Sequence, residues 1–397
     1  MTDTNIDTVR QKAKPLANSP KFGQVKGFRD YTGEEAKKRE RIKDYIVETF
    51  TQYGFEPAET PIIEQEEFVR GENKQDEAVS DIFKLEDKGN RKLALRYEFT
   101  FQLKRLMQNR KLPYKRYQIG PVFRDEPVTS NRLRQFTQCD VDVVGSSVKD
   151  EAEILALSND VLTRLKIKPI ILVNNRQLLN EILDDNNIDT KNRMQVLREI
   201  DKVDKLPEKE VINNLKKLGA DKVLASLKKG ESYFKKFKDY EEILELIKYC
   251  KMYGVKVIFS PTVIRGLSYY NGNVFEIKSK EVKETLIAGG SYEFNNVQCT
   301  GISFGLDRLC LVAKVDDKSE KYLIVSLNED KTAIQLSQKL RESGKVTSVY
   351  YGKPSKALDY ANSYGYGQVI FVGKEEVKKR KYKIKDMKTG KEKQGKF

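Results

Sequence analysis

The fold is decided by residues 116–145, which have the sequence RYQIGPVFRDEPVTSNRLRQFTQCDVDVVG. Residues 117–124 and 135–144 both alternate in polarity as strands do, and the polar stretch between them, 125–133, contains one proline. This pattern predicts an antiparallel hairpin with a long loop. The segment LRYEFT at 95–100 leads into the hairpin and predicts a strand followed by a helix.

The predicted hairpin has one polar face, because successive side chains of a strand point to opposite sides of the sheet. Gln138, Asp140 and Asp142 share one face of the second strand. Gln118 and Arg124 share one face of the first strand. Alternation of this kind is by itself typical of a solvated outer face.

Three residues favour a ligand site over a solvated face. Phe136 places an aromatic ring on the polar face, and Arg132 and Arg134 add positive charge to the loop. Together they suit the floor and lid of a site for an anionic ligand. The pattern alone leaves both interpretations open.

The composition narrows the class of protein. A chain of 397 residues is long enough for two or three domains with their own cores. It has no apolar run of membrane-spanning length and no apolar signal core at its N-terminus, so we expect a soluble, cytoplasmic protein that does not bind a membrane. The four cysteines have no paired spacing, which argues against a disulfide framework and against a zinc site.

Charge and missing residue types narrow the chemistry further. The chain has 74 Lys plus Arg against 59 Asp plus Glu, and its formal charge of +15 favours a polyanionic partner such as nucleic acid, although lysine richness also arises from genome composition. Histidine is absent, which excludes Ser-His-Asp and Cys-His mechanisms and imidazole metal ligands. Catalysis must therefore use Arg, Glu, Asp, Gln, Thr, Tyr, backbone groups or bound Mg²⁺.

Periodicity organises the rest of the chain. Repeated helical stripes without a strand signal at 174–253 predict an inserted helical subdomain, and strand-rich segments on either side predict an antiparallel sheet. Asn271-Gly272 predicts a hairpin turn, and ETLIAGG predicts a strand that ends at paired glycines. From residue 322 onward strands and helices alternate, which predicts a small α/β domain with parallel pairings and a lysine-dense tail at 374–396.

From Val25 onward, the chain resembles the class IIa aminoacyl-tRNA synthetases and, most closely, the histidyl-tRNA synthetase family. Three motifs indicate the class: GFRDY with FEPAETPIIE; LRYEFT with GPVFRDEP and RLRQFTQCDVDVVG; and GISFGLDRL. Two peptides indicate the amino acid, VIRGLSYYNGNVFE and AGGSYEF, which are similar to the histidyl signatures RGLDYY and GGRYD.

The resemblance implies an α+β fold. A class II antiparallel sheet flanked by helices would carry a helical insertion and be followed by a C-terminal α/β anticodon-binding domain. The expected segments are a loose N-terminal arm, two parts of the catalytic domain on either side of the insertion, and the anticodon-binding domain. In chain order they are residues 1–25, 26–173, 174–253, 254–316 and 321–397.

The resemblance also implies a reaction. A histidine–tRNA ligase activates histidine with ATP to histidyl-adenylate and transfers histidine to the terminal ribose of tRNA(His). ATP and Mg²⁺ are the expected cofactors, and no protein motif for a metal is predicted. The first motif implies a homodimer.

Four residues match the family's ATP and reaction positions. Arg124 would hold the α-phosphate with Glu126 beside it, Arg308 the far end of ATP, and Arg265 would lie beside the reacting carboxylate and phosphate, which makes Arg124 and Arg265 the expected catalytic residues. Arginine suits these positions because its planar, permanently charged fork grips phosphate oxygens. The alternative for each is an ordinary surface or paired arginine.

Five residues match positions that bind the amino acid. Glu98, Thr100 and Gln138 match positions that receive the α-amino group, a use that suits a carboxylate and two neutral acceptors. Asp142 and Tyr270 match positions that bind the imidazole, where a carboxylate accepts from one ring N–H and a phenol pairs with the other nitrogen. Core packing is the alternative for Tyr270.

Further positions follow from the same resemblance. Tyr269 and Tyr292 match walls of the histidine pocket, and Arg132 and Arg134 match a loop that contacts the tRNA acceptor end. The paired glycines of AGGSYEF either let the backbone approach the ligand or form a turn at the strand end.

Four positions depart from the family pattern. Ser268 stands where the first signature has Asp, and Ser291 stands where the second has Arg. Gln118 and Thr137 occupy positions where relatives often carry histidine. An enzyme that supplies histidyl-tRNA but contains no histidine could be translated without its own product; compositional drift is the alternative, since tryptophan is absent too.

Two other functions compete with this prediction. One is a non-catalytic synthetase paralogue that regulates histidine biosynthesis, which usually lacks the C-terminal domain and the catalytic arginine that this chain has. The other is a sibling class IIa synthetase for threonine, proline or glycine, from which RGLSYYNGNVFE distinguishes the chain.

Overall fold

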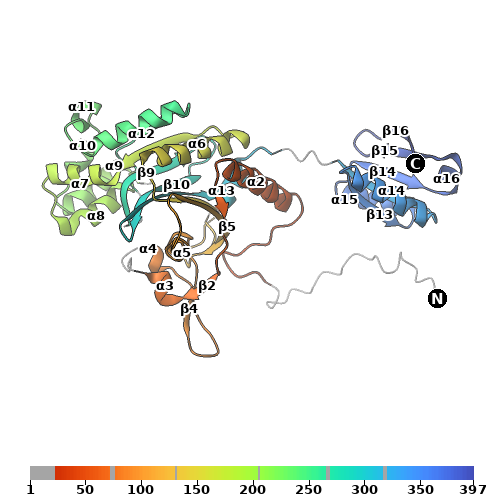
Figure 1. Ribbon diagram of the computed structural model, residues 1–397, viewed down its shortest axis with the longest axis horizontal. Helices are drawn as coiled ribbons and strands as arrows, with labels where there is room; N and C mark the ends of the chain where they lie inside the picture. The colour runs from red at the N-terminus through yellow and green to blue at the C-terminus, as the bar shows by residue number, and fades with distance from the viewer. Residues whose placement is uncertain (1–22, 72–76, 130–131, 204–205, 265–268, 316–319) are drawn as a thin grey trace. The chain divides into compact units, whose positions relative to one another are not determined.

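The computed structural model describes residues 23–71, 77–129, 132–203, 206–264, 269–315 and 320–397 (Figure 1). The chain divides into two compact units, Gln24–Val315 and a second that contains Asp316–Phe397. Arg265, Ser268 and almost all of the predicted N-terminal arm lie outside the described residues.

The first unit is built on an eight-stranded sheet in the order β1-β5-β6-β11-β10-β9-β7-β8. From edge to edge these strands are Glu56–Pro57, Tyr114–Phe123, Gln135–Val144, Val297–Gly305, Ile287–Phe294, Tyr270–Lys278, Ile170–Asn175 and Val257–Phe259. The six central strands pair antiparallel, whereas the edge strands β1 and β8 pair in parallel with β5 and β7. The predicted antiparallel sheet is confirmed.

Strands β5 and β6 form the hairpin that the sequence predicts. β5 begins at Tyr114, three residues earlier than the alternation indicates. In the register of the pair, Arg116 lies opposite Asp142, and Gln118 lies opposite Asp140. The longer strand therefore places a basic residue, Arg116, on the polar face.

Two long helices cover the apolar face of this sheet. α2 (Gly33–Gln52) and α6 (Val148–Arg164) contact each other, and both contribute to the main core. Ile42, Ile46 and Phe50 are fully buried on α2, at the helical spacing that the sequence shows, in the same core as Val141 and Val143 of β6. Since neighbours alternate along β6, the side chains of Gln138, Asp140 and Asp142 face away from these helices.

A smaller layer accompanies the large sheet. It contains a three-stranded sheet in the order β2-β4-β3, formed by Ile63–Gln65, Lys92–Leu95 and Lys84–Glu86. Its helices are α3 (Glu66–Arg70), α4 (Glu77–Ser80) and α5 (Thr100–Leu106). The strand-to-helix junction of LRYEFT thus joins β4 to α5.

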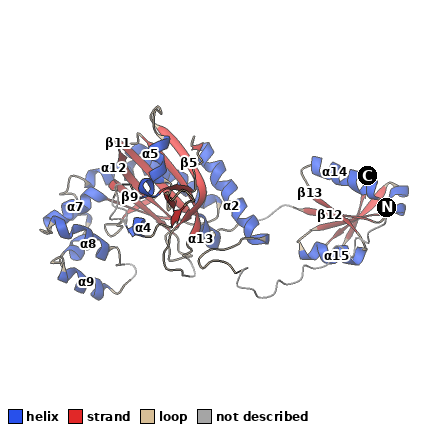
Figure 2. Cartoon of the chain, turned by 90° about the horizontal axis from the view of Figure 1, so that it is seen from below, coloured by secondary structure: helices blue, strands red, loops and turns tan. Residues whose placement is uncertain are grey.

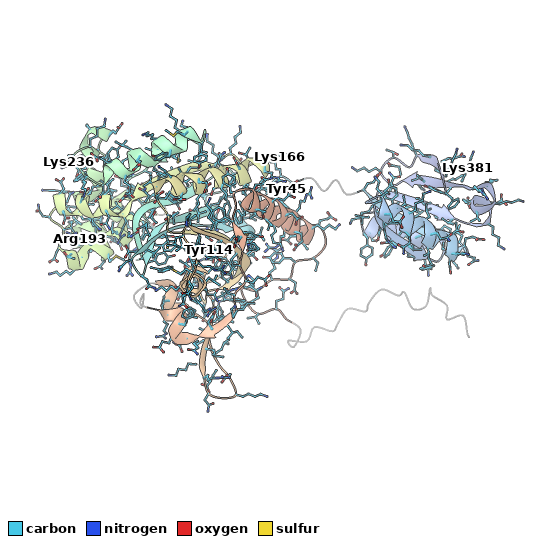
Figure 3. All side chains as sticks on the ribbon, viewed as in Figure 1. Tyr45, Tyr114, Lys166, Arg193, Lys236 and Lys381 are labelled. Atoms are coloured by element: carbon cyan, nitrogen blue, oxygen red, sulfur yellow. The ribbon has the colours of Figure 1, made fainter. Side chains whose placement is uncertain are left out.

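The segment between β7 and β8 is helical. It contains α7 (Arg176–Asp185), α8 (Thr190–Ile200), α9 (Glu208–Lys217), α10 (Val223–Leu227), α11 (Glu231–Phe234) and α12 (Tyr240–Met252). α12 packs on α6, so the segment is attached to the helix layer of the sheet. Arg193 and Lys236 lie on the outer surface of this segment (Figure 3).

Two predictions about turns are wrong. β9 runs through Asn271 and Gly272 without positive φ at either residue, because Asn271 exchanges side-chain hydrogen bonds with Gln298 at 3.1 and 3.2 Å within the sheet. β10 likewise continues through Gly289 and Gly290 to Phe294. A Cβ on Gly289 would lie 2.1 Å from the carbonyl oxygen of Gly301 in β11, so this glycine permits close strand packing and does not mark a turn.

The second unit has a five-stranded sheet in the order β13-β12-β14-β15-β16. These strands are Val346–Tyr351, Lys321–Ser326, Gln368–Val372, Lys381–Asp386 and Glu392–Lys396. β13, β12 and β14 pair in parallel, as the alternating pattern predicts. Helices α14 (Asp330–Glu342) and α15 (Pro354–Ser363) lie on opposite sides of the sheet (Figure 2).

The lysine-dense tail adds structure that the sequence analysis missed. After the short helix α16 (Lys374–Lys379), β15 and β16 form an antiparallel hairpin on the sheet edge. Tyr382 is buried between the exposed Lys381 and Lys383, an alternation that could have predicted the strand. Among the described residues, no helix is long and apolar enough to cross a membrane.

Candidate active site

Two cavities in the first unit contain most of the predicted site residues. The first cavity, of about 280 Å³, is bounded by α2, β6, β10, β11 and α13 (Leu306–Val312). It is lined by the predicted ATP residues Arg124, Glu126 and Arg308, and also by Arg132 and Gln138. The residues of the second and third class motifs therefore meet at one concavity.

Basic side chains outnumber acidic ones around the first cavity. They are Arg29, Lys38, Arg39, Arg124, Arg132 and Arg308, against Glu35, Glu126 and Asp307. Arg124 donates from Nε to the carbonyl oxygen of Tyr97 at 3.2 Å, and its guanidinium lies 5.2 Å from the ring centroid of Phe136. Arg308 donates from Nη1 to the carbonyl oxygen of Thr285 at 2.7 Å. Guanidinium groups held in this way suit a polyphosphate ligand.

Asp307 fixes the helix that carries Arg308. Its Oδ1 accepts from the Tyr31 hydroxyl and from Nη1 of Arg39, each at 2.7 Å, and its Oδ2 accepts from the backbone N–H of Thr137 at 2.8 Å. Burial, and next the hydrogen bond to Asp307, raise the pKa of Tyr31. One carboxylate thus joins α13 to α2, to β6 and to the segment before α2.

The loop arginines fold the loop back onto itself. Arg132 pairs through Nε with Glu126. Arg134 donates from Nε to the Glu126 carbonyl oxygen at 3.2 Å and pairs with Asp125 at 3.0 Å. Arg132 lines the first cavity, whereas Arg134 lines neither cavity.

The second cavity has a volume of about 440 Å³ and lies beside α3 and α5. It is lined by Gln65, Glu67, Phe68, Val69, Arg70, Gly71, Tyr97, Glu98, Thr100, Phe101, Lys104, Tyr269 and Phe294. Three of the predicted amino-acid residues, Glu98, Thr100 and Tyr269, are in this set. The Tyr269 hydroxyl donates to Oε2 of Glu98 at 3.3 Å, and burial, then the Glu98 charge, raise the pKa of Tyr269.

Asp142 lies buried on β6 and already has two partners. Arg116, which is fully buried, pairs with it through Nη2 at 2.7 Å, and Tyr292 donates its hydroxyl to the other carboxylate oxygen. Burial raises the pKa of Asp142, and Arg116 and the Tyr292 hydroxyl oppose that rise. A Cβ on Gly301 would lie 2.1 Å from Oδ1 of Asp142, so the glycine on β11 makes room for this carboxylate.

Asp140 is 5% exposed and forms no ion pair among the described residues. Ser303 donates its hydroxyl to Oδ1 of Asp140 at 2.5 Å. Burial, and then the charge of Asp142, raise the pKa of Asp140 to about 8, although the charge of Arg116 lowers it in part. Gln138, two residues earlier, donates from Nε2 to the Ser303 hydroxyl oxygen at 2.8 Å.

The structure groups some predicted residues and separates others. Tyr270, Tyr292 and Asp142 are buried and line neither cavity. The ring centroid of Tyr270 lies 4.8 Å from that of Tyr269, so Tyr270 contacts the wall of the second cavity from behind. Arg265 lies outside the described residues.

Sequence reasoning missed Arg116 and Ser303. Arg116 is two residues from Gln118 on the same strand face, so extending the predicted strand by one residue would have found it. Ser303 lies within GISFGLDRL, and its role depends on the register that places it opposite Asp140. No pattern within that peptide indicates that register.

The departures from the family pattern have defined contacts. Gln118 donates from Nε2 to the Thr60 hydroxyl at 2.6 Å, and Thr137 accepts from Nη2 of Arg39 at 3.2 Å. Ser291 donates its hydroxyl to Glu151 on α6 and lines neither cavity. The serine that replaces the signature arginine therefore acts between the sheet and α6.

Comparisons of sequence place these features in a family. The family model for histidyl-tRNA synthetase matches residues 27–309, and that for an anticodon binding domain matches residues 311–397. A histidine–tRNA ligase of Bacillus cereus is 34% identical over 93% of this chain and 96% of the relative. One of Shouchella clausii is 32% identical over 94% of this chain and 97% of the relative.

Solved structures agree at the level of the fold. The histidyl-tRNA synthetase of a Nostoc species superposes with a TM-score of 0.82, at 24% identity, over 94% of this chain and 97% of that structure. A Bacillus halodurans protein described as an ATP phosphoribosyltransferase regulatory subunit/histidyl-tRNA synthetase gives a TM-score of 0.77 at 22% identity, over 91% of this chain and 99% of that structure.

The antiparallel sheet, the matching family models and the named relatives together identify the chain as a class II aminoacyl-tRNA synthetase, which is an aminoacyl-tRNA ligase. Within that class, the chain belongs to the histidyl-tRNA synthetase family, since its family model and the named relatives both cover most of the chain. The resemblance inferred from the motifs is confirmed.

Proposed function

We propose that this ligase activates histidine with ATP to histidyl-adenylate and transfers the histidyl group to the terminal ribose of tRNA(His). One observation carries the proposal: an arginine-lined cavity reaches Gln138 on β6, and the same strand face continues to a buried carboxylate, Asp142, that is paired with Arg116. A site for a polyphosphate is thus followed, on the same strand face, by a carboxylate that can accept a hydrogen bond from an N–H group.

ATP binds the first cavity in this proposal. Arg124 holds the α-phosphate, Arg308 holds the far phosphates, and Glu126 orients the nucleotide with Arg132. The side chains fit because guanidinium groups neutralise phosphate charge and remain protonated. Arg265 is proposed to lie beside the reacting carboxylate, as the family pattern implies.

Mg²⁺ enters with ATP in this proposal. No group of three or more Asp, Glu or Cys side chains suited to a metal occurs in the part of the chain that the structure describes. The charged side chains that line the first cavity are mainly basic, so the cavity fits the phosphate oxygens of a metal–nucleotide complex better than it fits a free cation. The metal would neutralise phosphate charge.

Histidine binds between the two cavities. Glu98, Thr100 and Gln138 receive its ammonium group, and Asp142 accepts a hydrogen bond from an imidazole N–H. Tyr270 pairs with the other ring nitrogen, while Tyr269 and Tyr292 form the walls. In support, Glu98, Thr100 and Tyr269 line one cavity, and Tyr292, whose ring centroid lies 5.7 Å from that of Tyr269, donates its hydroxyl to Asp142.

tRNA(His) is proposed to contact both units. Residues 174–253 form the helical insertion between the catalytic segments 26–173 and 254–316, and residues 321–397 read the anticodon. Supporting features are exposed basic residues such as Lys381 on β15 (Figure 3). Arg132 and Arg134 lie in a loop that would approach the acceptor end. Phosphate contacts of this kind weaken as salt rises.

A homodimer is proposed on the basis of an apolar surface. Ile63 and Leu85 lie on the same face of the three-stranded sheet and are 50% and 38% exposed. Leu93 and Leu95 of the central strand share that face. An apolar sheet face of this kind suits an interface with a second copy of the chain. A cytoplasmic location is proposed because aminoacylation serves translation.

The dimer is tested by sedimentation. Leu85→Lys should convert a dimer to a monomer, whereas Leu244→Lys, which alters a leucine that is 40% exposed on α12, should leave the dimer intact. A monomeric wild-type chain, or a dimer that survives Leu85→Lys, would contradict the proposal.

The reaction is tested by ATP–pyrophosphate exchange with histidine, threonine, proline and glycine separately. Exchange that depends on histidine supports the proposal. Exchange with another amino acid alone would show a sibling synthetase. No exchange with any of them would show a non-catalytic paralogue.

A further inference from the structure

Gln138 has an unusual arrangement in the first cavity. Its Nε2 donates to the Ser303 hydroxyl oxygen at 2.8 Å, and its Oε1 is buried without a hydrogen-bond partner among the described residues. A buried amide oxygen left in this state costs free energy comparable to a lost hydrogen bond. The cost is removed if a ligand donates to that oxygen.

The orientation of the amide follows from the groups behind it. The Ser303 hydroxyl gives its proton to Oδ1 of Asp140 at 2.5 Å, so the same oxygen can only accept from Gln138. The atom of Gln138 that faces Ser303 must then be the nitrogen, and the carbonyl oxygen must point the other way. Asp140 begins this series of hydrogen bonds because its Oδ1 accepts from Ser303, as an ionised carboxylate or the carbonyl oxygen of a protonated carboxyl can do.

The sheet holds the hydrogen-bonded series Gln138–Ser303–Asp140 in place. Ser303 on β11 lies directly opposite Asp140 on β6, and Gly305 lies opposite Gln138. Asp140 is 5% exposed. Asp140 therefore has little freedom to exchange partners with water.

We propose that Ser303 and Asp140 are positioning residues that orient the Gln138 amide, so that its carbonyl oxygen is free to accept from the ammonium group of the amino acid. Gln138 alone touches the substrate; Ser303 and Asp140 act through it. A flipped amide would present two N–H donors to a cation and would oppose binding. This inference rests on the proposed function, because it assumes that an amino-acid ammonium binds at Gln138.

The test uses the full-length enzyme in ATP–pyrophosphate exchange with histidine as the variable substrate. Ser303→Ala should raise KM for histidine about tenfold, which corresponds to about 1.4 kcal/mol, while kcat and KM for ATP change less than about twofold. Ser303→Cys, which keeps the size but accepts hydrogen bonds weakly, should behave similarly. Ser303→Thr retains the hydroxyl and should keep the wild-type KM.

Ser291→Ala is the matched control. It also removes a buried serine hydroxyl that donates to a buried carboxylate, but Ser291 lines neither cavity. It should lower the melting temperature without changing KM for histidine. An equal rise in KM in this variant would show a general structural effect and would overturn the inference.

A double-mutant cycle separates orientation from packing. In a Gln138→Ala background, Ser303→Ala should have no further effect on KM, because no amide remains to orient. Additive effects would overturn the inference. If the wild-type enzyme shows no exchange with histidine, the proposed function fails; if it does and Ser303→Ala keeps the wild-type KM, this inference alone fails.

Discussion

Two buried carboxylates of the same domain have opposite environments. Asp142 on β6 pairs with the guanidinium of Arg116 at 2.7 Å, whereas Glu151 on α6 has the Ser291 hydroxyl and, at 2.7 Å, the amide of Asn273. By its resemblance to the second signature peptide, Ser291 stands at the position of an arginine. A cation thus lies beside Asp142, whereas among the residues that the structure describes no cation pairs with Glu151, the carboxylate that joins α6 to the sheet.

The difference shows what a buried cation does. Burial alone raises the pKa of a carboxyl, and a nearby positive charge opposes that rise. The pKa of Glu151, which lacks such a charge, is raised to about 7 by burial, against the lowering effect of Ser291 and Asn273. A carboxylate that accepts a hydrogen bond from a substrate must stay ionised, which a neighbouring cation favours. A carboxyl group with a purely structural role can instead be protonated.

Removing the cation from Asp142 should have the largest effect. Arg116→Met leaves Asp142 buried without its ion-pair partner, which favours the protonated form of Asp142, so kcat/KM for histidine should fall roughly a hundredfold. Pyrophosphate exchange measures the loss. Arg116→Lys keeps a charge and should retain more activity than Arg116→Met; equal activity in the two variants would argue against a role for the charge.

Displacing Asp142 without altering its charge should have the next largest effect. Gly301→Ala places a methyl group against Oδ1 of Asp142 and must move the side chain. KM for histidine should rise by about tenfold, with a smaller change in KM for ATP. Gly230→Ala is the control, because an added Cβ there has no neighbour within 4 Å. If Gly301→Ala keeps the wild-type KM for histidine, Asp142 does not contribute to the histidine pocket.

The sequence predicted the polar face and not its pairing. Alternation placed Gln138, Asp140 and Asp142 together, because strand geometry depends on local spacing. Which carboxylate receives a cation depends on the register that sets Arg116 opposite Asp142, and that register involves residues distant in the chain.

The wrong turn predictions have the same cause. Asn271-Gly272 has a sequence that favours a hairpin turn, but β9 runs through both residues, and Asn271 exchanges side-chain hydrogen bonds with Gln298 of β11. The paired glycines at 289–290 serve close strand contact, which only the neighbouring strand reveals. Tertiary contacts override local turn preference at both places.

The buried environment of Glu151 predicts an effect of pH on the free energy of unfolding, of intermediate size. Its pKa rises from 4.5 to about 7 on folding, so the folded state binds more protons and stability falls as pH rises through that interval. The full effect is about 3 kcal/mol at most. Glu151→Gln should remove this fall, so its free energy of unfolding should gain on that of the wild type between pH 5 and pH 8.

Chemical denaturation across that range measures the gain. Glu241→Gln, which alters an exposed glutamate on α12, should leave the pH dependence unchanged. A parallel pH dependence in Glu151→Gln and the wild type would show that Glu151 does not hold a proton at neutral pH.

Restoring histidine should have the smallest effect. Gln118 and Thr137 are both hydrogen-bonded, so Gln118→His and Thr137→His should change kcat by less than about twofold, since no lost contact is restored. That result would favour drift or a neutral exchange. A large gain in turnover would instead show that the absence of histidine carries a catalytic cost.

The most direct test of the central claim is pyrophosphate exchange by Asp142→Asn. If a carboxylate held by Arg116 and Tyr292 accepts from the imidazole, kcat/KM for histidine should fall roughly a hundredfold, while KM for ATP stays near that of the wild type. A kcat/KM for histidine equal to that of the wild type would contradict the account.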